Sequence, residues 1–304
     1  MHRNTKNYYW RKMIMKKILA LLMAGAMAAT AFAGCSANVN SNSGSDATKG
    51  ATDATAAADS DWAYISDKGK LTIGITYFEP MNYLGEDGKL TGFETDFATA
   101  VCEELGVTPN FQEIEWDSKE IELNAKTIDC IWNGLTITAE REENMSISLP
   151  YMANKQVMVV KAENADKYKT ADDMKDVKVV AEAGSAGEEV AKGEKFFADA
   201  KYTPADSQAK CLLEVKSGTS DVAIIDYVMS IGTLRAGSDY ADLKVVEDQE
   251  FSPEVYGIAF RKGSDTTAKV NDTIMKLYTD GKLQEIAKKY NLEDQIPKIN
   301  NTEE

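Results

Sequence analysis

Residues 128–141 run Ile-Asp-Cys-Ile-Trp-Asn-Gly-Leu-Thr-Ile-Thr-Ala-Glu-Arg. The first residues predict an apolar strand that runs out at Gly134, and two hydroxyls follow at alternate positions, Thr136 and Thr138, ahead of Arg141. In an open α/β sheet, ligands bind beyond the carboxyl ends of the strands. A glycine there lets a ligand approach backbone carbonyls, a threonine hydroxyl donates or accepts, and a guanidinium fits a carboxylate.

The stretch therefore predicts acceptors for an ammonium and a donor fork for a carboxylate, the two ends of a zwitterion. Thr138 fits a helix N-cap better than a ligand contact, because Ala-Glu-Arg follows it. The alternative is a strand-to-helix turn that carries a surface arginine.

Composition limits the classes of function. The 304 residues are 43% hydrophobic and suffice for one large domain or two medium ones. Residues 1–34 hold six basic residues and no acidic one, which leaves 28 basic against 49 acidic residues in the rest. That balance of −21 argues against nucleic acid or anionic lipid headgroups as partners. The only histidine, His2, lies in the same leader, so we expect no catalytic residues, metal or cofactor.

The first 34 residues predict a signal peptide. Lys16-Lys17 precedes an apolar run that ends in Ala33-Gly34-Cys35. This ending resembles the lipobox of bacterial lipoproteins, which implies that Cys35 is lipidated, although Phe32 departs from the usual aliphatic residue and a non-lipidated signal peptide is the alternative. Translation is expected to start at Met13 or Met15.

Residues 35–61 are then a lipidated cysteine and a disordered tether, because Ser, Asn, Ala, Thr, Gly and Asp leave little to bury. We expect the protein on the outer face of the cytoplasmic membrane. The other cysteines, Cys102, Cys130 and Cys211, match no metal motif and are expected as buried free thiols. A bridge between Cys102 and Cys130 stays open.

From residue 70 onward, apolar runs alternate with helical spacing, which is typical of α/β folds with parallel strands. We expect strands at 70–75, 108–114, 128–132, 156–161, 177–181, 222–225, 243–246 and 255–260. The helices are expected near 93–105, 118–125, 207–216, 227–235, 265–279 and 282–290, with another after the turn at 183–187. Glu94 and Asp96 are expected on a solvated helix start.

Five marks in order resemble the polar amino acid-binding proteins of bacterial ABC importers, over about residues 70–292. They are Leu-Thr-Gly-Phe-Glu-Thr-Asp at 90–96, the stretch 128–141, Ser-Leu-Pro-Tyr at 148–151, Gly184-Ser185, and Ser-Asp-Val-Ala-Ile-Ile-Asp at 220–226. The resemblance implies an α/β, type 2 periplasmic-binding fold. It has two lobes, each a mostly parallel sheet flanked by helices, joined by two crossing hinge strands. Lobe 1 would hold 62–153 and 251–304, and lobe 2 would hold 154–250.

The resemblance also implies the binding residues. Aromatic walls would come from Phe78 and Trp116. The ligand ammonium would meet the Gly134 carbonyl, the Thr136 hydroxyl and Asp226, and the carboxylate would meet Arg141, Ser185 and the Ala186 amide. Each has a plainer alternative: core aromatics, a glycine cap before a helix, or, for Asp226, a helix N-cap.

Selectivity for the ligand side chain would come from positions near Thr76, Glu79, Glu115, Trp132 and Glu182. The three acidic residues among these positions disfavour glutamate or aspartate as the ligand. Glutamine, cystine and arginine remain candidate ligands. The implied role is a monomer that binds a free L-amino acid and delivers it to the transmembrane subunits of an ABC permease. The alternatives are a dehydratase of a cyclic amino acid precursor on the same fold, and a sensor subunit that presents its ligand to a receptor.

Overall fold

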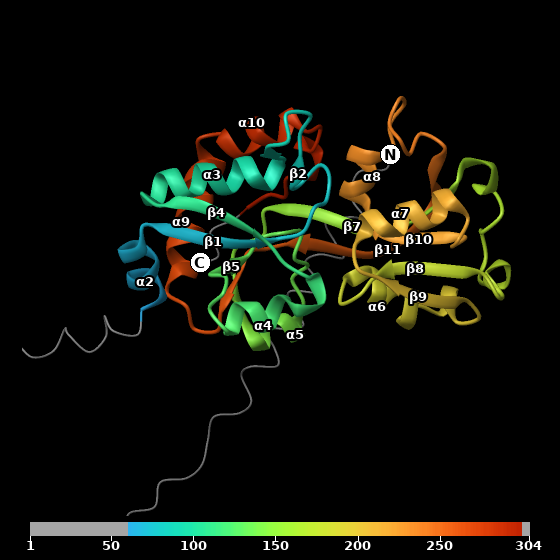
Figure 1. Cartoon of the computed structure of the whole chain (residues 1–304), viewed down its shortest axis with the longest axis horizontal. Helices are drawn as coiled ribbons and strands as arrows, with labels where there is room; N and C mark the ends of the chain where they lie inside the picture. The colour runs from blue at the N-terminus through green and yellow to red at the C-terminus, as the bar shows by residue number, and fades with distance from the viewer. Residues whose placement is uncertain (1–59, 300–304) are drawn as a thin grey trace, which may run out of the picture. The chain divides into compact units, whose positions relative to one another are not determined.

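Two five-stranded sheets with helices packed on their faces organise residues 60–299, the part of the chain that the computed structural model describes (Figure 1). These residues all fall within one unit, Ala51–Glu304. We call the part around the first sheet, β4-β1-β5-β12-β6, lobe 1, and the part around the second, β11-β7-β10-β8-β9, lobe 2.

The strands are β1 (Lys70–Ile75), β2 (Tyr83–Leu84), β3 (Leu90–Thr91), β4 (Thr108–Glu113), β5 (Cys130–Ile131), β6 (Met145–Ile147), β7 (Met152–Lys161), β8 (Lys178–Glu182), β9 (Lys201–Ala205), β10 (Val222–Asp226), β11 (Leu243–Tyr256) and β12 (Ala259–Arg261). The α-helices are α2 (Asp61–Lys68), α3 (Phe93–Leu105), α4 (Lys119–Asn124), α5 (Ala139–Asn144), α6 (Ala186–Gly193), α7 (Gln208–Ser217), α8 (Tyr227–Thr233), α9 (Thr266–Thr279) and α10 (Lys282–Lys289). Short 3₁₀ turns are η1 (Trp116–Ser118), η2 (Ala162–Asn164), η3 (Ala171–Met174), η4 (Lys195–Phe197) and η5 (Glu293–Gln295).

The α/β architecture with two sheet-containing lobes is the one expected. Strands β4, β1 and β5 pair in parallel, as do β10, β8 and β9. The remaining pairs in each sheet are antiparallel. The sheets are therefore more mixed than expected, because β7, β11 and β12 run against the strands beside them.

The long strands β7 and β11, which both belong to the second sheet, pair with each other in antiparallel fashion. They extend from lobe 2 to lobe 1 (Figure 1). Their pairing shifts register between Val245 and Glu250 and again between Phe251 and Glu254. The expected lobe boundaries, at 153/154 and 250/251, fall inside these two strands. Where a boundary belongs within them stays a prediction.

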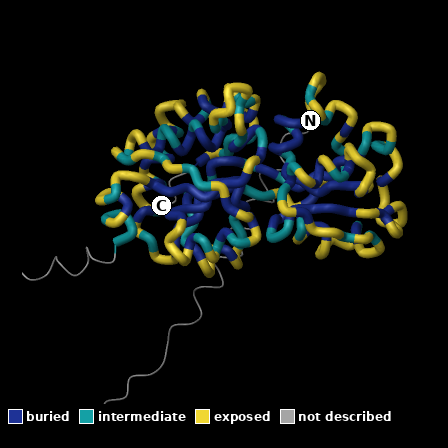
Figure 2. Tube along the Cα trace, in the orientation of Figure 1, coloured by how far each residue is buried: buried dark blue, intermediate teal, exposed yellow. Residues whose placement is uncertain are grey.

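Buried side chains follow the expected periodicity. Phe93, Phe97 and Val101 recur along α3 and are all fully buried, and β1 is buried from Leu71 to Ile75. Burying one such side chain contributes about 1.5–3 kcal/mol. Figure 2 shows the buried residues concentrated along the strands and the exposed ones in outer helices and loops. Cys102, Cys130 and Cys211 are buried free thiols, as expected.

Several elements differ from the expectation. Ser60 and Asp61, assigned to the tether, belong to the folded body: the Ser60 hydroxyl caps α2 and Asp61 pairs with Arg261 at 2.9 Å. The strands expected at 243–246 and 255–260 are instead one continuous strand, β11, followed by β12. Strands β6 and β9 were not expected. The predicted leader, Cys35, Met13, Met15 and the tether up to residue 59 lie outside the described residues.

None of the helices between residues 60 and 299 has the length and hydropathy to cross a bilayer. The same residues contain no group of three or more His, Cys, Asp or Glu side chains that could hold a metal ion.

Candidate ligand-binding site

A pocket lies between the two lobes. Lobe 1 contributes Phe78, Trp116, Asn133, Gly134, Thr136 and Arg141, and lobe 2 contributes Glu182, Ser185, Ala186, Gln208 and Asp226. All eight residues predicted to bind the ligand are among these lining residues. The structure therefore brings them to one place, and their contact with a ligand stays a prediction.

Arg141 presents a buried positive charge to the pocket. It lies in the first turn of α5, where the Thr138 hydroxyl caps the helix by accepting from the Arg141 backbone at 3.2 Å. The guanidinium donates to the Thr136 carbonyl at 2.8 Å and, across the lobes, to the Gly184 carbonyl at 3.4 Å. Among the described side chains it has no ion-pair partner. A buried cation that is bound only to neutral carbonyls favours an anionic ligand group.

Asp226 presents a buried carboxylate from the opposite lobe. It ends β10 and stands at the N-cap position of α8, yet its side chain makes no cap hydrogen bond. Its oxygens accept from the amides of Asn154 at 2.7 Å, of Gln156 at 2.5 Å, and of Gln208. Burial raises the pKa of Asp226, and these amide hydrogen bonds oppose the rise. The geometry favours an aspartate set into the pocket over a helix cap.

The Gly134 loop is held by Glu94, and the expectation of a solvated Glu94 was wrong. This side chain is 1% exposed. Its carboxylate accepts from the Gly134 backbone at 2.8 Å, from the Asn82 amide at 2.7 Å and from the Tyr151 hydroxyl. Burial raises the pKa of Glu94 to about 7 despite these donors. Gly134 has φ +60°, and a Cβ there would lie 2.8 Å from the Phe78 ring, so a larger residue would disturb the pocket wall.

On lobe 2, Ser185 opens α6. Its hydroxyl accepts from the Glu188 backbone at 3.2 Å and donates to the Glu182 carbonyl at 2.7 Å. The hydroxyl is thus engaged within the loop, while Ser185 and Ala186 line the pocket at the helix N-terminus. Free amides at such an end attract anions, as the prediction for Ala186 requires.

Contacts between the lobes flank the pocket. The Lys119 ammonium, from the start of α4, donates to the Gly184 carbonyl at 3.1 Å and to the Trp116 carbonyl at 3.1 Å. On another side, Glu79 pairs with Arg235 at 3.1 Å. These contacts close the pocket between the lobes.

Comparison with known proteins identifies the family. Residues 71–293 match the sequence pattern of the bacterial extracellular solute-binding proteins, family 3. The chain belongs to this family. It is 32% identical over 228 residues to the L-cystine-binding protein TcyJ of Escherichia coli strain K12, an alignment that covers 74% of this chain and 84% of that protein.

Solved structures of other binding proteins agree with this chain in fold. A substrate-binding protein of an ABC uptake transporter from Streptococcus pneumoniae, with bound histidine, has a TM-score of 0.70 and 34% identity. The alignment covers 79% of this chain and 100% of the Streptococcus pneumoniae protein. The ancestral amino acid-binding protein AncCDT-1, described as a precursor of cyclohexadienyl dehydratase, has a TM-score of 0.69 and 32% identity over 76% of this chain and 99% of that one. The family places this protein among extracellular binding proteins.

For a family 3 protein, the pocket also needs walls that fit the ligand side chain. Phe78 and Trp116 line the pocket and are 4% and 5% exposed, so each serves as a wall and as part of the core. The Lys119 ammonium lies 4.7 Å from the centre of the Trp116 ring. Contact of either ring with a ligand stays a prediction.

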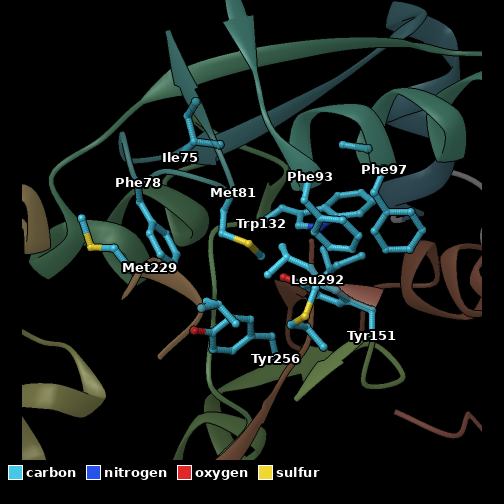
Figure 3. Packing of buried hydrophobic residues seen from close by; sticks show 14 of the residues in the cluster. Ile75, Phe78, Met81, Phe93, Phe97, Trp132, Tyr151, Met229, Tyr256 and Leu292 are labelled. Carbon is cyan, nitrogen blue, oxygen red and sulfur yellow. The ribbon is translucent and has the colours of Figure 1, made fainter. Parts of the chain in front are cut away.

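Of the five residues predicted to select the side chain, Glu182 is the one in the pocket lining. Thr76 lies behind the pocket lining, where its hydroxyl accepts from the side-chain amide of the lining residue Asn133 at 2.6 Å. Glu79 is engaged with Arg235, and Glu115 is exposed. Trp132 is fully buried and packs edge-on against Phe97, with 5.2 Å between the ring centroids (Figure 3).

Sequence reasoning missed two pocket-lining residues, Asn133 and Gln208, and it missed Lys119, whose ammonium donates to the Gly184 carbonyl. Asn133 directly precedes Gly134, where the expected strand runs out, and the prediction gave it no role. Gln208 follows the N-cap Ser207 at the start of α7, where a glutamine has many ordinary roles. Lys119 stands among acidic residues that suggest a solvated helix. In the sequence, the sole clue to Asn133 was its place beside Gly134.

Proposed function

We propose that this family 3 protein is the substrate-binding component of an ABC amino acid importer. It captures a free polar or cationic L-amino acid, of the glutamine, cystine or arginine class, and delivers it to the transmembrane permease subunits. One observation carries this proposal: a buried guanidinium and a buried carboxylate, from different lobes, line one pocket. The related proteins named above, which bind cystine and histidine, support an amino acid ligand.

The two charges suit the two ends of a zwitterion. Arg141 would take the α-carboxylate, helped by Ser185 and the amide of Ala186. Asp226 would take the α-ammonium, together with the Gly134 carbonyl and the Thr136 hydroxyl. Because the partners come from both lobes, the closed form gains contacts with the ligand that an open form lacks. A ligand shifts such an equilibrium by its difference in affinity for the two forms.

The proposal also includes the route to the membrane. Cys35 would carry the lipid anchor, and residues 36–59 would tether the folded monomer near the permease. A flexible segment of that length spans about 25–30 Å on average. The segment lies outside the described residues, so this part rests on the sequence.

A thermal-shift screen of the protein from residue 36 onward, against the twenty amino acids, cystine and ornithine, tests the proposal. Unfolding and refolding the protein first removes any ligand retained from the cell. A binder at a thousand times its Kd adds about 4 kcal/mol of stability, which raises Tm by several degrees. If no amino acid raises Tm after verified refolding, the proposal is wrong.

A dehydratase of a cyclic amino acid precursor is the alternative function, because one similar structure is the precursor of such an enzyme. That structure is itself described as an amino acid-binding protein, which favours binding here too. Incubation with prephenate or arogenate, with product formation followed by absorbance, distinguishes a dehydratase from a binding protein. Binding without turnover supports the importer component.

A further inference from the structure

A second carboxylate, Glu182, faces the pocket from lobe 2. It ends β8, which runs parallel to β10, and Asp226 ends β10. The two acids therefore stand at the same edge of the sheet, and they are 4% and 5% exposed. A zwitterion needs one carboxylate for its ammonium, so the pocket holds one acid more than the ligand backbone uses.

The two acids differ in their partners. Asp226 accepts hydrogen bonds from three side-chain amides, those of Asn154, Gln156 and Gln208. Gln208 favours the ionised form of Glu182 through its side chain and backbone and so lowers the Glu182 pKa, and the Gln208 side-chain amide also donates to Asp226. A carboxylate has about four acceptor sites. Glu182 thus keeps acceptor capacity that protein groups leave unused.

The charged and titratable groups around Glu182 come from three elements. Asp226 on β10 disfavours its ionisation, Lys119 on α4 favours it, and the Cys211 thiol lies on α7. The Lys119 ammonium donates to the carbonyls of Gly184 and Trp116, and no ion pair joins it to Glu182 among the described side chains. Burial, with Asp226 adding to it, raises the pKa of Glu182 to about 8. At neutral pH the closed, empty pocket therefore favours the protonated acid.

We propose that Glu182 binds the end of the ligand side chain and is ionised only when that end is a cation. This inference rests on the proposed function. With a neutral donor such as an amide, Glu182 keeps its proton and accepts a hydrogen bond through its carbonyl oxygen. With a guanidinium or ammonium, Glu182 releases its proton to the solvent and the carboxylate pairs with the cation. The complexes with neutral and cationic ligands thus differ by one proton.

Arginine and citrulline make a matched pair of probes, because citrulline has nearly the same shape and replaces the guanidinium with a neutral urea. Isothermal titration calorimetry at pH 7, in two buffers of different ionisation enthalpy, counts the protons taken up on binding. Both titrations start from the same free protein, so its protonation cancels in the difference. We expect citrulline to take up more protons than arginine, by close to one.

The affinity ratio has an expected pH dependence as well. The arginine complex holds fewer protons, so rising pH favours it. The preference for arginine over citrulline should rise by up to about tenfold per pH unit while Glu182 stays protonated in the citrulline complex, and flatten once it ionises there.

Glu182→Gln should abolish the difference in proton uptake and lower the arginine-to-citrulline ratio by about 10- to 100-fold. Glu163→Gln is the matched control, because it removes an exposed acid of lobe 2 outside the pocket lining and should leave the ratio unchanged. If Glu182→Gln does not fold, the proton count on the unaltered protein still decides.

Equal proton uptake with both ligands, or binding of citrulline with no binding of arginine, overturns the role of Glu182 and leaves the amino acid proposal standing. Absence of binding by every amino acid in the thermal-shift screen contradicts the proposed function itself.

Discussion

At the scale of single residues, charge and burial together distinguish the site. Arg141 was predicted from its spacing after Gly134 and Thr136, and the structure buries it beside both. In the sequence, Glu94 looks like any acidic residue in the first turn of a helix. In the structure it is buried, and its carboxylate accepts from the Gly134 backbone. Whether such an acid faces water or the core depends on which other segment packs over it, and sequence order does not show that.

Replacement of Arg141 by alanine should lower ligand affinity by two to four decades, about 3–5 kcal/mol. The reason is that the ligand carboxylate would be desolvated without a counter-charge. Calorimetry with the best ligand from the screen measures the change. Lys175→Ala is the control, since this exposed basic residue lies outside the pocket lining. An affinity within a few-fold of wild type in Arg141→Ala would remove this residue from the site.

At the scale of elements, short-range patterns predicted most interior strands and helices well. Strand β1 and helix α7 lie within a residue of the expected bounds. Strand β9 was missed because it lies at the edge of its sheet, with mostly exposed or half-buried residues and no clear alternation. Strand β11 was expected as two pieces, and it is one strand because its pairing with β7 resumes at Glu250 and Phe251 after the register shift that follows Val245.

Lys119→Met should weaken ligand binding by about 3- to 30-fold and raise the rate of ligand release. The α4 ammonium links lobe 1 to the Gly184 carbonyl of lobe 2, and the loss of that hydrogen bond leaves the closed form less stable. Stopped-flow displacement measures the release rate. Lys288→Met, at an exposed position on α10, serves as the control. An unchanged release rate in Lys119→Met would mean that this contact does not hold the lobes together.

At the scale of the whole molecule, buried acids set the pH dependence of stability. Burial raises the pKa of Glu94 to about 7, and of Glu182 and Glu254 to about 8. The folded protein thus binds more protons than the unfolded chain between about pH 5 and 8. Stability must fall as pH rises through that window. Acids whose pKa is lowered, such as Asp265, act in the opposite direction at lower pH.

We therefore expect the Tm of the ligand-free protein to decrease from pH 5 to pH 8. Glu254→Gln should flatten this slope, because the amide cannot ionise. Differential scanning calorimetry across the range measures both. Glu247→Gln, at an exposed acid on the same strand, should keep the wild-type slope. A Tm that increases steadily toward pH 8 would contradict the raised pKa values.

By itself, the sequence determined the α/β alternation, the order of most elements and the residue types of a zwitterion site, because hydrophobic periodicity and the types of residue that follow each strand are local properties. The tertiary structure decided which of those residues meet. It set Trp132 in the core and Glu182 in the pocket, placed Lys119 across from Gly184, and put Glu94 beneath the Gly134 loop. The places of Trp132 and Glu94 follow from packing within lobe 1, and those of Glu182 and Lys119 from the meeting of the two lobes. Contacts between residues 40 to 70 positions apart follow from that packing and leave no periodic trace in the chain.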